Sequence, residues 1–307
     1  MRSIAVLLGL AIAWIATATS ALAQNGLERF ERDIKPHIEL QKFTYGNAQA
    51  LGLSGFVLND VVAVVPASPA TNDKPSTLKI EKVTVEELDF DRLKFGDSDD
   101  LPRFAKVRFE GMTGDDELFT SLAPYGVPKV PVDATIDFRL DSAAKVFSMN
   151  KLEINLRGQA TLAIAFVMEG ISDEASKVES AKDDGRLRTA TLTLTYSGLL
   201  AKMLPALAKE QGSNADAFVS LALMSIAGFA GDQGAPTQKV LDAVASFIGD
   251  WKAPKGPLAI GIKPAKTAGI SDLDKVMEPN ALVDVFGLNA SYSGTRAGAA
   301  KTPPMPK

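Results

Sequence analysis

The chain has 307 residues, no cysteine and one histidine, and its 37 acidic against 33 basic side chains give a net charge of −4. A mildly acidic chain without a basic cluster argues against nucleic acid and anionic membrane surfaces as partners. The missing cysteines exclude disulfides, thiol catalysis and thiolate metal sites.

Residues 1–23 follow the pattern of a signal peptide. Arg2 supplies the positive start, residues 4–15 form an apolar run, and Ala21-Leu22-Ala23 form the cleavage motif. The run is shorter than the roughly 20 apolar residues of a membrane span, so we expect no span after cleavage. The alternative is an uncleaved N-terminal anchor. We predict an exported protein, periplasmic or secreted, from a presumed Gram-negative bacterium.

The next segments begin a sheet. Residues 24–42 have apolar positions at helical spacing until Pro36. Residues 43–45 and 51–65 are rich in β-branched and aromatic residues, which predicts strands, and residues 66–75 form a loop of proline and small polar residues.

An unusual five-residue period follows. Between Leu78 and Phe95, apolar residues recur at alternating steps of two and three. A helix would scatter them around its axis, and a plain strand would flip them between faces. A strongly coiled strand with a bulge at each double polar step keeps them on one face. A short solenoid and two ordinary strands joined near Glu86-Glu87 remain as alternatives.

The clearest strand signals lie between 132 and 196. Strict alternation of apolar and polar residues predicts strands at 132–141, 151–157, 160–168 and 189–196, with short turns between them. A charged segment at 172–184 suggests a short helix. Short connections between consecutive strands predict an antiparallel meander. In the third of these strands, Ala163, Ala165 and Val167 make the second face small and apolar, so we expect something to cover it.

Helical patterns dominate after Ser197. The segment 197–213 has a serine cap and a kink at Pro205, Asn214 begins a second helix, and residues 236–251 form a third. Short strands are predicted at 257–264 and 288–292. We predict an α+β fold, in which an N-terminal twisted antiparallel sheet, a meander with bulged strands, is covered by C-terminal helices. One domain would span 24–292, strand-rich over 43–196 and helix-rich over 197–292, with a disordered tail at 293–307.

No catalytic residues are predicted. His37 has no base or orienting partner in the sequence, and three S-x-x-K matches, beginning at Ser76, Ser142 and Ser148, lack the partner motifs of serine–lysine enzymes. No phosphate-binding or dinucleotide motif indicates a cofactor. The acidic turns with Asp97, Asp99 and Asp100 or with Asp115, Asp116 and Glu117 break the spacing of a calcium loop, so no metal site is predicted.

Two resemblances accompany these patterns. The five-residue units from Leu78 and the meander "VDATIDFRLD…LEINLRGQATLAIAF" resemble the strand repeats of AsmA-like envelope proteins. That resemblance implies a lipid-facing role in the cell envelope, although this chain is short and lacks the anchor of that family. The whole chain after residue 23 is similar to uncharacterised secreted proteins of alphaproteobacteria, which imply no activity.

We therefore expect an exported, non-enzymatic protein that binds an apolar ligand or lipid between its sheet and its helices. The expected ligand-facing residues are Ala163, Ala165, Val167, Leu221, Met224 and Phe229. An envelope structural or adaptor protein that docks a protein partner is the alternative, and a hydrolase without a recognised motif is a third.

Overall fold

The structure is a computed structural model, and it describes residues 25–66, 75–93, 101–115, 122–174, 184–269, 272, 278 and 280–293. The predicted signal peptide, the tail beyond Ser293 and most of the predicted helix at 172–184 lie outside these residues. So do the acidic positions Asp97, Asp99, Asp100, Asp116 and Glu117.

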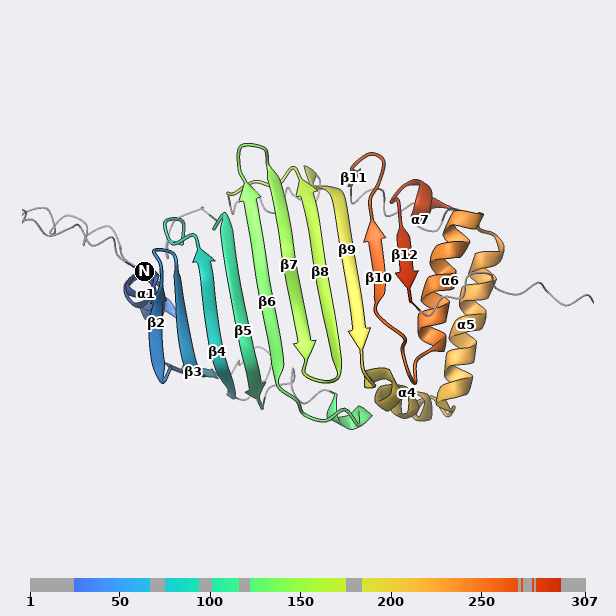
Figure 1. Cartoon of the computed structure of the whole chain (residues 1–307), viewed down its shortest axis with the longest axis horizontal. Helices are drawn as coiled ribbons and strands as arrows, with labels where there is room; N and C mark the ends of the chain where they lie inside the picture. The colour runs from blue at the N-terminus through green and yellow to red at the C-terminus, as the bar shows by residue number, and fades with distance from the viewer. Residues whose placement is uncertain are drawn as a thin grey trace, which may run out of the picture.

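Twelve strands form one antiparallel sheet (Figure 1). They are β1 (Lys42–Thr44), β2 (Asn47–Leu51), β3 (Gly55–Val65), β4 (Ser76–Leu88), β5 (Phe104–Gly114), β6 (Val132–Asp141), β7 (Val146–Leu156), β8 (Ala160–Glu169), β9 (Arg186–Tyr196), β10 (Leu258–Ile262), β11 (Ala268–Gly269) and β12 (Asn289–Tyr292). From β3 to β10 each strand pairs with the next one in the chain, while β1 and β2 share β3, β11 pairs β9, and β12 pairs β10. The predicted antiparallel meander and the α+β class are confirmed.

The helices lie at the two ends of the sheet. They are α1 (Gly26–Arg29), the π-helix η3 (Phe30–Ile34), the 3₁₀ turns η4 (Lys35–His37) and η5 (Ala123–Tyr125), α4 (Leu199–Glu210), α5 (Ala215–Gly231), α6 (Ala235–Gly249) and α7 (Ala281–Asp284). The helix α1 packs on β2 and β3, whereas α6 packs on β12 and β10 at the opposite end (Figure 1).

The C-terminal helices therefore do not cover the sheet as predicted. Among the described residues, α6 packs on the last two strands of the sheet and the first turn of α4 packs at the end of β9, while α5 packs on α4 and α6. The reason is the return of the chain: after α6 it adds β10 and β12 to the sheet, which holds the helices at this edge. One local prediction for α4 is wrong, because Gly198 at φ 102° and not Ser197 is its N-cap. Pro205, where a kink was predicted, lies inside the helix.

The five-residue pattern forms one strand and not two. The strand β4 runs through Glu86-Glu87 with a register shift between Val85 and Glu87 against β5, as expected for a bulge. At the earlier double polar step, Glu81-Lys82, the pairing with β3 and β5 stays in register. The reason is that both neighbours carry the same step, Asn59-Asp60 in β3 and Glu110-Gly111 in β5. The third step, Asp91-Arg92, falls in a turn after the strand.

One face of the sheet is apolar along its whole width. Neighbouring strands align their apolar residues in cross-strand rows. One row passes over ten strands: Ala50, Phe56, Val85, Val107, Ile136, Leu152, Ile164, Leu192, Ile260 and Ala290. Alternation places the polar residues of the same strands on the opposite face.

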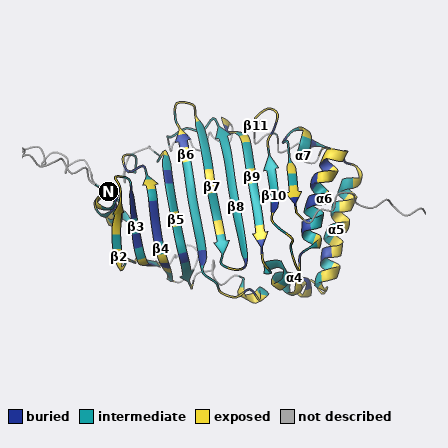
Figure 2. Ribbon diagram, in the orientation of Figure 1, coloured by how far each residue is buried: buried dark blue, intermediate teal, exposed yellow. Residues whose placement is uncertain are grey.

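The apolar face is buried at its two ends. At the first end, Phe30 from η3 packs on Phe56, Leu58 and Val83. At the other, Phe247 from α6 packs on Leu258 and on the rings of Tyr196 and Tyr292, which lie 5.1 and 5.3 Å from it. Between the two ends, β6–β9 are mostly of intermediate burial (Figure 2). The described residues thus cover the two ends of the apolar face and leave its middle open.

Candidate functional site

A pocket of about 540 Å³ lies on the open middle of the apolar face. Its floor is formed by large apolar side chains from three adjacent strands: Ile136, Phe138 and Leu140 of β6, Phe147 and Met149 of β7, and Phe166 and Met168 of β8. Pockets of 300–1,000 Å³ with mostly apolar walls are typical of small-molecule sites.

The aromatic residues of the floor lie in two neighbouring cross-strand rows. Strand pairing places Phe147 between Leu140 and Met168, and Met149 between Phe138 and Phe166. The rings of Phe138 and Phe147 stack with centroids 5.7 Å apart, and those of Phe147 and Phe166 lie 5.8 Å apart. Aromatic contacts at this distance stabilise the floor, while the flexible methionines adapt to the shape of an occupant.

Two short segments, far apart in the chain, form the wall at one end of the pocket. Leu101 and Pro102 precede β5, and Ile171 and Ser172 follow β8. The backbone N–H of Leu101 donates to the carbonyl of Asp173 at 2.9 Å, which joins the two segments directly.

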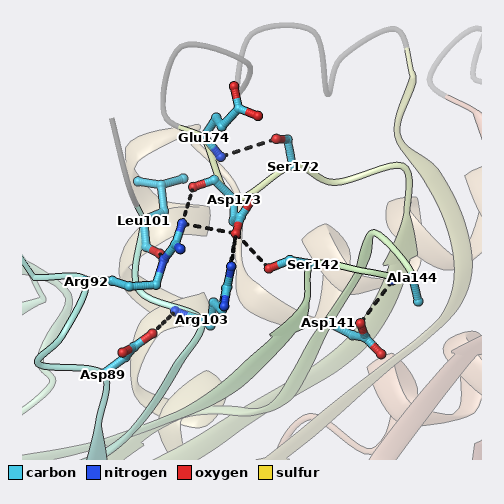
Figure 3. Close-up of polar contacts among 10 residues, drawn as sticks. All are labelled: Asp89, Arg92, Leu101, Arg103, Asp141, Ser142, Ala144, Ser172, Asp173 and Glu174. Atoms are coloured by element: carbon cyan, nitrogen blue, oxygen red, sulfur yellow. Dashed lines mark hydrogen bonds and ion pairs between the residues drawn. The ribbon is translucent and has the colours of Figure 1, made fainter. Parts of the chain in front are cut away.

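Asp173 holds this wall in place with its side chain (Figure 3). Its Oδ2 accepts hydrogen bonds from Arg103 at 2.8 and 3.1 Å and from the hydroxyl of Ser142 at 2.7 Å, and Arg92 lies 3.0 Å away. Arg92 also donates from Nε to the carbonyl of Leu101 at 2.9 Å. Four separate parts of the chain therefore meet at one carboxylate beside the pocket.

The electrostatics of this cluster follow from its donors. The hydrogen bonds from Arg103 and then Ser142 lower the pKa of Asp173 to about 2, against a smaller opposing effect of burial. Asp173 is therefore a carboxylate at neutral pH. Its partner Arg103 is half-exposed, whereas Arg92 and Asp173 are largely buried.

A second, smaller cavity adjoins the first. It has a volume of about 160 Å³ and is lined by Met168, Gly185, Leu187, Ile262, Ala268, Gly269 and Phe286. Met168 lines both cavities. The apolar hollow thus extends from β6 to β10 and β11.

The six residues predicted to face an apolar ligand do not line either cavity. Ala163, Ala165 and Val167 alternate with the floor residues of β8 and lie on the opposite face, where strand pairing sets them beside Thr193, Thr191 and Thr189. Leu221, Met224 and Phe229 belong to α5, where Leu221 and Met224 are 60% and 63% exposed. The structure therefore does not bring the two groups together.

The residues that form the site carry a sequence signal of another kind. Phe138, Phe147, Phe166, Met149 and Met168 are the large apolar members of the alternating strands. For Phe138, Phe166 and Met168 the alternation indicated a shared face. Phe147 and Met149 precede the strand predicted at 151–157, and a register shift between Met149 and Leu152 brings them onto the same face. Whether these side chains stay uncovered depends on where the helices pack. The alternation of apolar and polar residues does not show where the helices pack.

The residues considered for catalysis or metal binding lie in separate parts of the described structure. Ser142 of the S-x-x-K match at Lys145 lies in the turn between β6 and β7 and donates to Asp173, while His37 lies in η4. Among the described residues, no group of three or more histidine, aspartate or glutamate side chains is arranged to hold a metal ion.

Comparisons with known proteins add little to the site. A protein-family profile described only as "Uncharacterized protein" matches residues 153–293, which is less than half of the chain and runs from β7 to just beyond β12. A search of curated proteins found no match.

Within the described part of the chain, no single helix is long and apolar enough to cross a membrane. The pair α4 and α5 passes together by length and composition but is bent by 91°.

Proposed function

We propose that this protein is an exported, periplasmic binding protein for an apolar ligand, and that the ligand lies on the open middle of the apolar face. One observation carries the proposal: most of the large apolar side chains of β6–β8 stay only partly buried around a 540 Å³ hollow, although the same face is buried at both ends. A ligand that covers the apolar surface still exposed here contributes roughly 25 cal/mol for each Å² that it buries. The site therefore lies on the sheet and not between the sheet and the helices.

A single charge in the floor tests the proposal. In the variant Met149→Lys, an ammonium replaces a thioether between Phe138 and Phe166, and binding an apolar ligand there requires the charge to lose its water. We expect the affinity for an apolar fluorescent dye and for a 16-carbon fatty acid to fall at least tenfold, equivalent to about 1.4 kcal/mol. The protein is expressed with its own export signal. Dye fluorescence and native mass spectrometry then measure its affinity for the dye and for the fatty acid.

The matched control is Met224→Lys, the same substitution at a residue that is 63% exposed on α5. It should bind as the wild type does, and circular dichroism should show both variants folded. The proposal is overturned if the wild type binds neither probe, or if folded Met149→Lys binds as tightly as the wild type. A dimer that buries the hollow and excludes the dye also overturns it.

The outer face of α5 favours docking of an envelope protein partner as a second candidate function. From Ala217 to Gly231 this helix carries no charged residue, yet Leu221 and Met224 are exposed. Water-facing helix surfaces ordinarily carry charged or polar residues. If α5 docks a partner, Met224→Lys abolishes its recovery from an envelope extract, whereas Met149→Lys leaves it intact.

A further inference from the structure

The two cavities lie over the same pair of cross-strand rows. One row consists of Leu140, Phe147, Met168, Leu187 and Ala268, and the other of Phe138, Met149, Phe166, Ala190 and Ile262. The main cavity occupies the first three strands of these rows, the side cavity occupies the last strands, and Met168 borders both. A straight path therefore runs across the strands through both cavities.

The length of this path suits one extended chain. From β6 to β10 and β11 there are four strand spacings of about 4.8 Å, which is roughly 19 Å. An extended chain advances about 1.2 Å per bond, so the path matches about 16 carbon atoms. The side cavity is small, at about 160 Å³.

The two ends of the path differ in polarity. At the outer end of the main cavity, Ser172 is the one polar residue among the described lining residues and lies next to Asp173, Arg103 and Arg92. The described residues that line the side cavity contribute apolar side chains and glycine backbone. A ligand with one polar end therefore places that end near Ser172 and its apolar tip near Phe286.

We propose that the ligand is a single-chain amphiphile, such as a fatty acid or a single-chain phospholipid, that lies across the strands, and that the side cavity sets the longest chain accepted. This inference rests on the proposed function of the main cavity. Met168 separates the part of the site that every chain fills from the part that only long chains reach. Ala268, at the far end of the row, limits the tip.

A series of saturated fatty acids with ten to eighteen carbons tests the inference by competition with the apolar dye. Wild-type affinity should rise about fourfold for each buried methylene and level off near 16 carbons. The variant Ala268→Leu fills the side cavity, so its plateau should begin about three carbons earlier, with unchanged affinity for the shortest chains. The control Ala163→Leu makes the same change on the polar face of β8 and should reproduce the wild-type series.

The outcomes separate this inference from the proposed function. If short chains bind and the plateau of Ala268→Leu coincides with that of the wild type, the chain-length inference falls and the proposed function stands. If the wild type binds the dye but no fatty acid, the inference falls and the proposed function stands; if it binds neither, both fall. A two-chain phospholipid that binds more tightly than a single-chain phospholipid with the same 16-carbon chain also overturns the single-chain assignment.

A second variant keeps the test valid if Ala268→Leu does not fold. Met168→Ala removes the side chain between the two cavities and widens the path. We expect the affinity for 18-carbon relative to 12-carbon chains to increase about fourfold or more. An unchanged ratio contradicts the inference.

Discussion

At the scale of single residues, Asp173 is the polar group on which the pocket wall depends. Its carboxylate joins the segments before β5 and after β8 through Arg103, Arg92 and Ser142. The pKa of Asp173 is lowered from 3.8 to about 2 in the folded protein. A lowered pKa means that the unfolded chain takes up the proton first as the pH falls. The stability that this group contributes is therefore complete above about pH 4 and is lost as the pH falls toward 2.

The variant Asp173→Asn tests this link between charge and stability. Asparagine loses the charge that Arg103 and Arg92 pair with, so we expect the free energy of unfolding at pH 7 to fall by about 1–2 kcal/mol. The difference from the wild type should shrink between pH 4 and pH 2, because the wild-type carboxylate becomes protonated. Urea unfolding at pH 7, 4 and 2.5 measures this difference in the free energy of unfolding.

The neighbouring Asp141 provides the control for that experiment. Its side chain accepts one hydrogen bond from the backbone N–H of Ala144 in the exposed turn after β6. Asp141→Asn keeps an acceptor oxygen and should change stability by no more than about 0.5 kcal/mol. A gap between wild type and Asp173→Asn that stays constant from pH 7 to 2.5 would show that the charge of Asp173 contributes nothing.

At the scale of elements, the first strands share one irregularity. The double polar steps of β3, β4 and β5 lie side by side, with Asn59 opposite Lys82 and Lys82 opposite Glu110. The second residue of the step has a left-handed backbone in β3 and β5, with φ 54° at Asp60 and φ 67° at Gly111. Gly111 also donates its N–H to Asp133 of β6 at 2.8 Å. The shared step keeps the apolar residues of three strands on one face.

Gly111→Ala should destabilise the sheet by about 2 kcal/mol or more. A left-handed backbone disfavours a side chain, and a Cβ at this position would overlap the side chain of Glu81, which would have to move away from Arg157. Gly158→Ala is the matched control, since it has φ 71° but open space around its Cβ, and it should lose only about 1 kcal/mol. If urea unfolding shows that both variants lose the same free energy of unfolding, the side chain of Glu81 makes no steric contribution.

Alternation predicted the strands well because it is a local property. The strands at 132–141 and 160–168 follow directly from period-two patterns, and Asn214 caps α5 as its sequence indicates. The site was predicted wrongly for a physical reason. Small apolar residues such as Ala163 suggested a covered face, but the side chains of Glu153 and Thr193 on adjacent strands flank it without any helix above. Which face stays open is decided by the packing of distant segments.

At the scale of the whole molecule, the apolar face is covered only where a helix reaches it. Phe30 from the N-terminal turns and Phe247 from α6 close the two ends, and the described helices leave β6–β8 between them open. The apolar character of α5 suggested that this helix lies on the sheet. It stacks on α4 and α6 instead, because β10 and β12 already occupy the neighbouring sheet positions.

This arrangement predicts a pattern of methionine oxidation. Met149 and Met168 line the open hollow, Met224 is exposed on α5, and Met112 packs against the covered first end. In dilute peroxide, Met224 should be oxidised fastest and Met112 slowest, because oxidation follows exposure of the sulfur. A 16-carbon fatty acid at about ten times its Kd occupies roughly nine-tenths of the molecules, so oxidation of Met149 and Met168 should slow about tenfold.

Peptide mass spectrometry over a time course reads all four sites in one sample, and Met224 serves as the internal control. Its rate should not change with the fatty acid, since α5 stands outside the hollow. Protection of Met224 with no protection of Met149 and Met168 would move the ligand from the sheet to the outer face of α5. Joint protection of the two hollow-lining methionines follows only if one ligand spans β7 and β8, because these side chains come from adjacent strands of the same face.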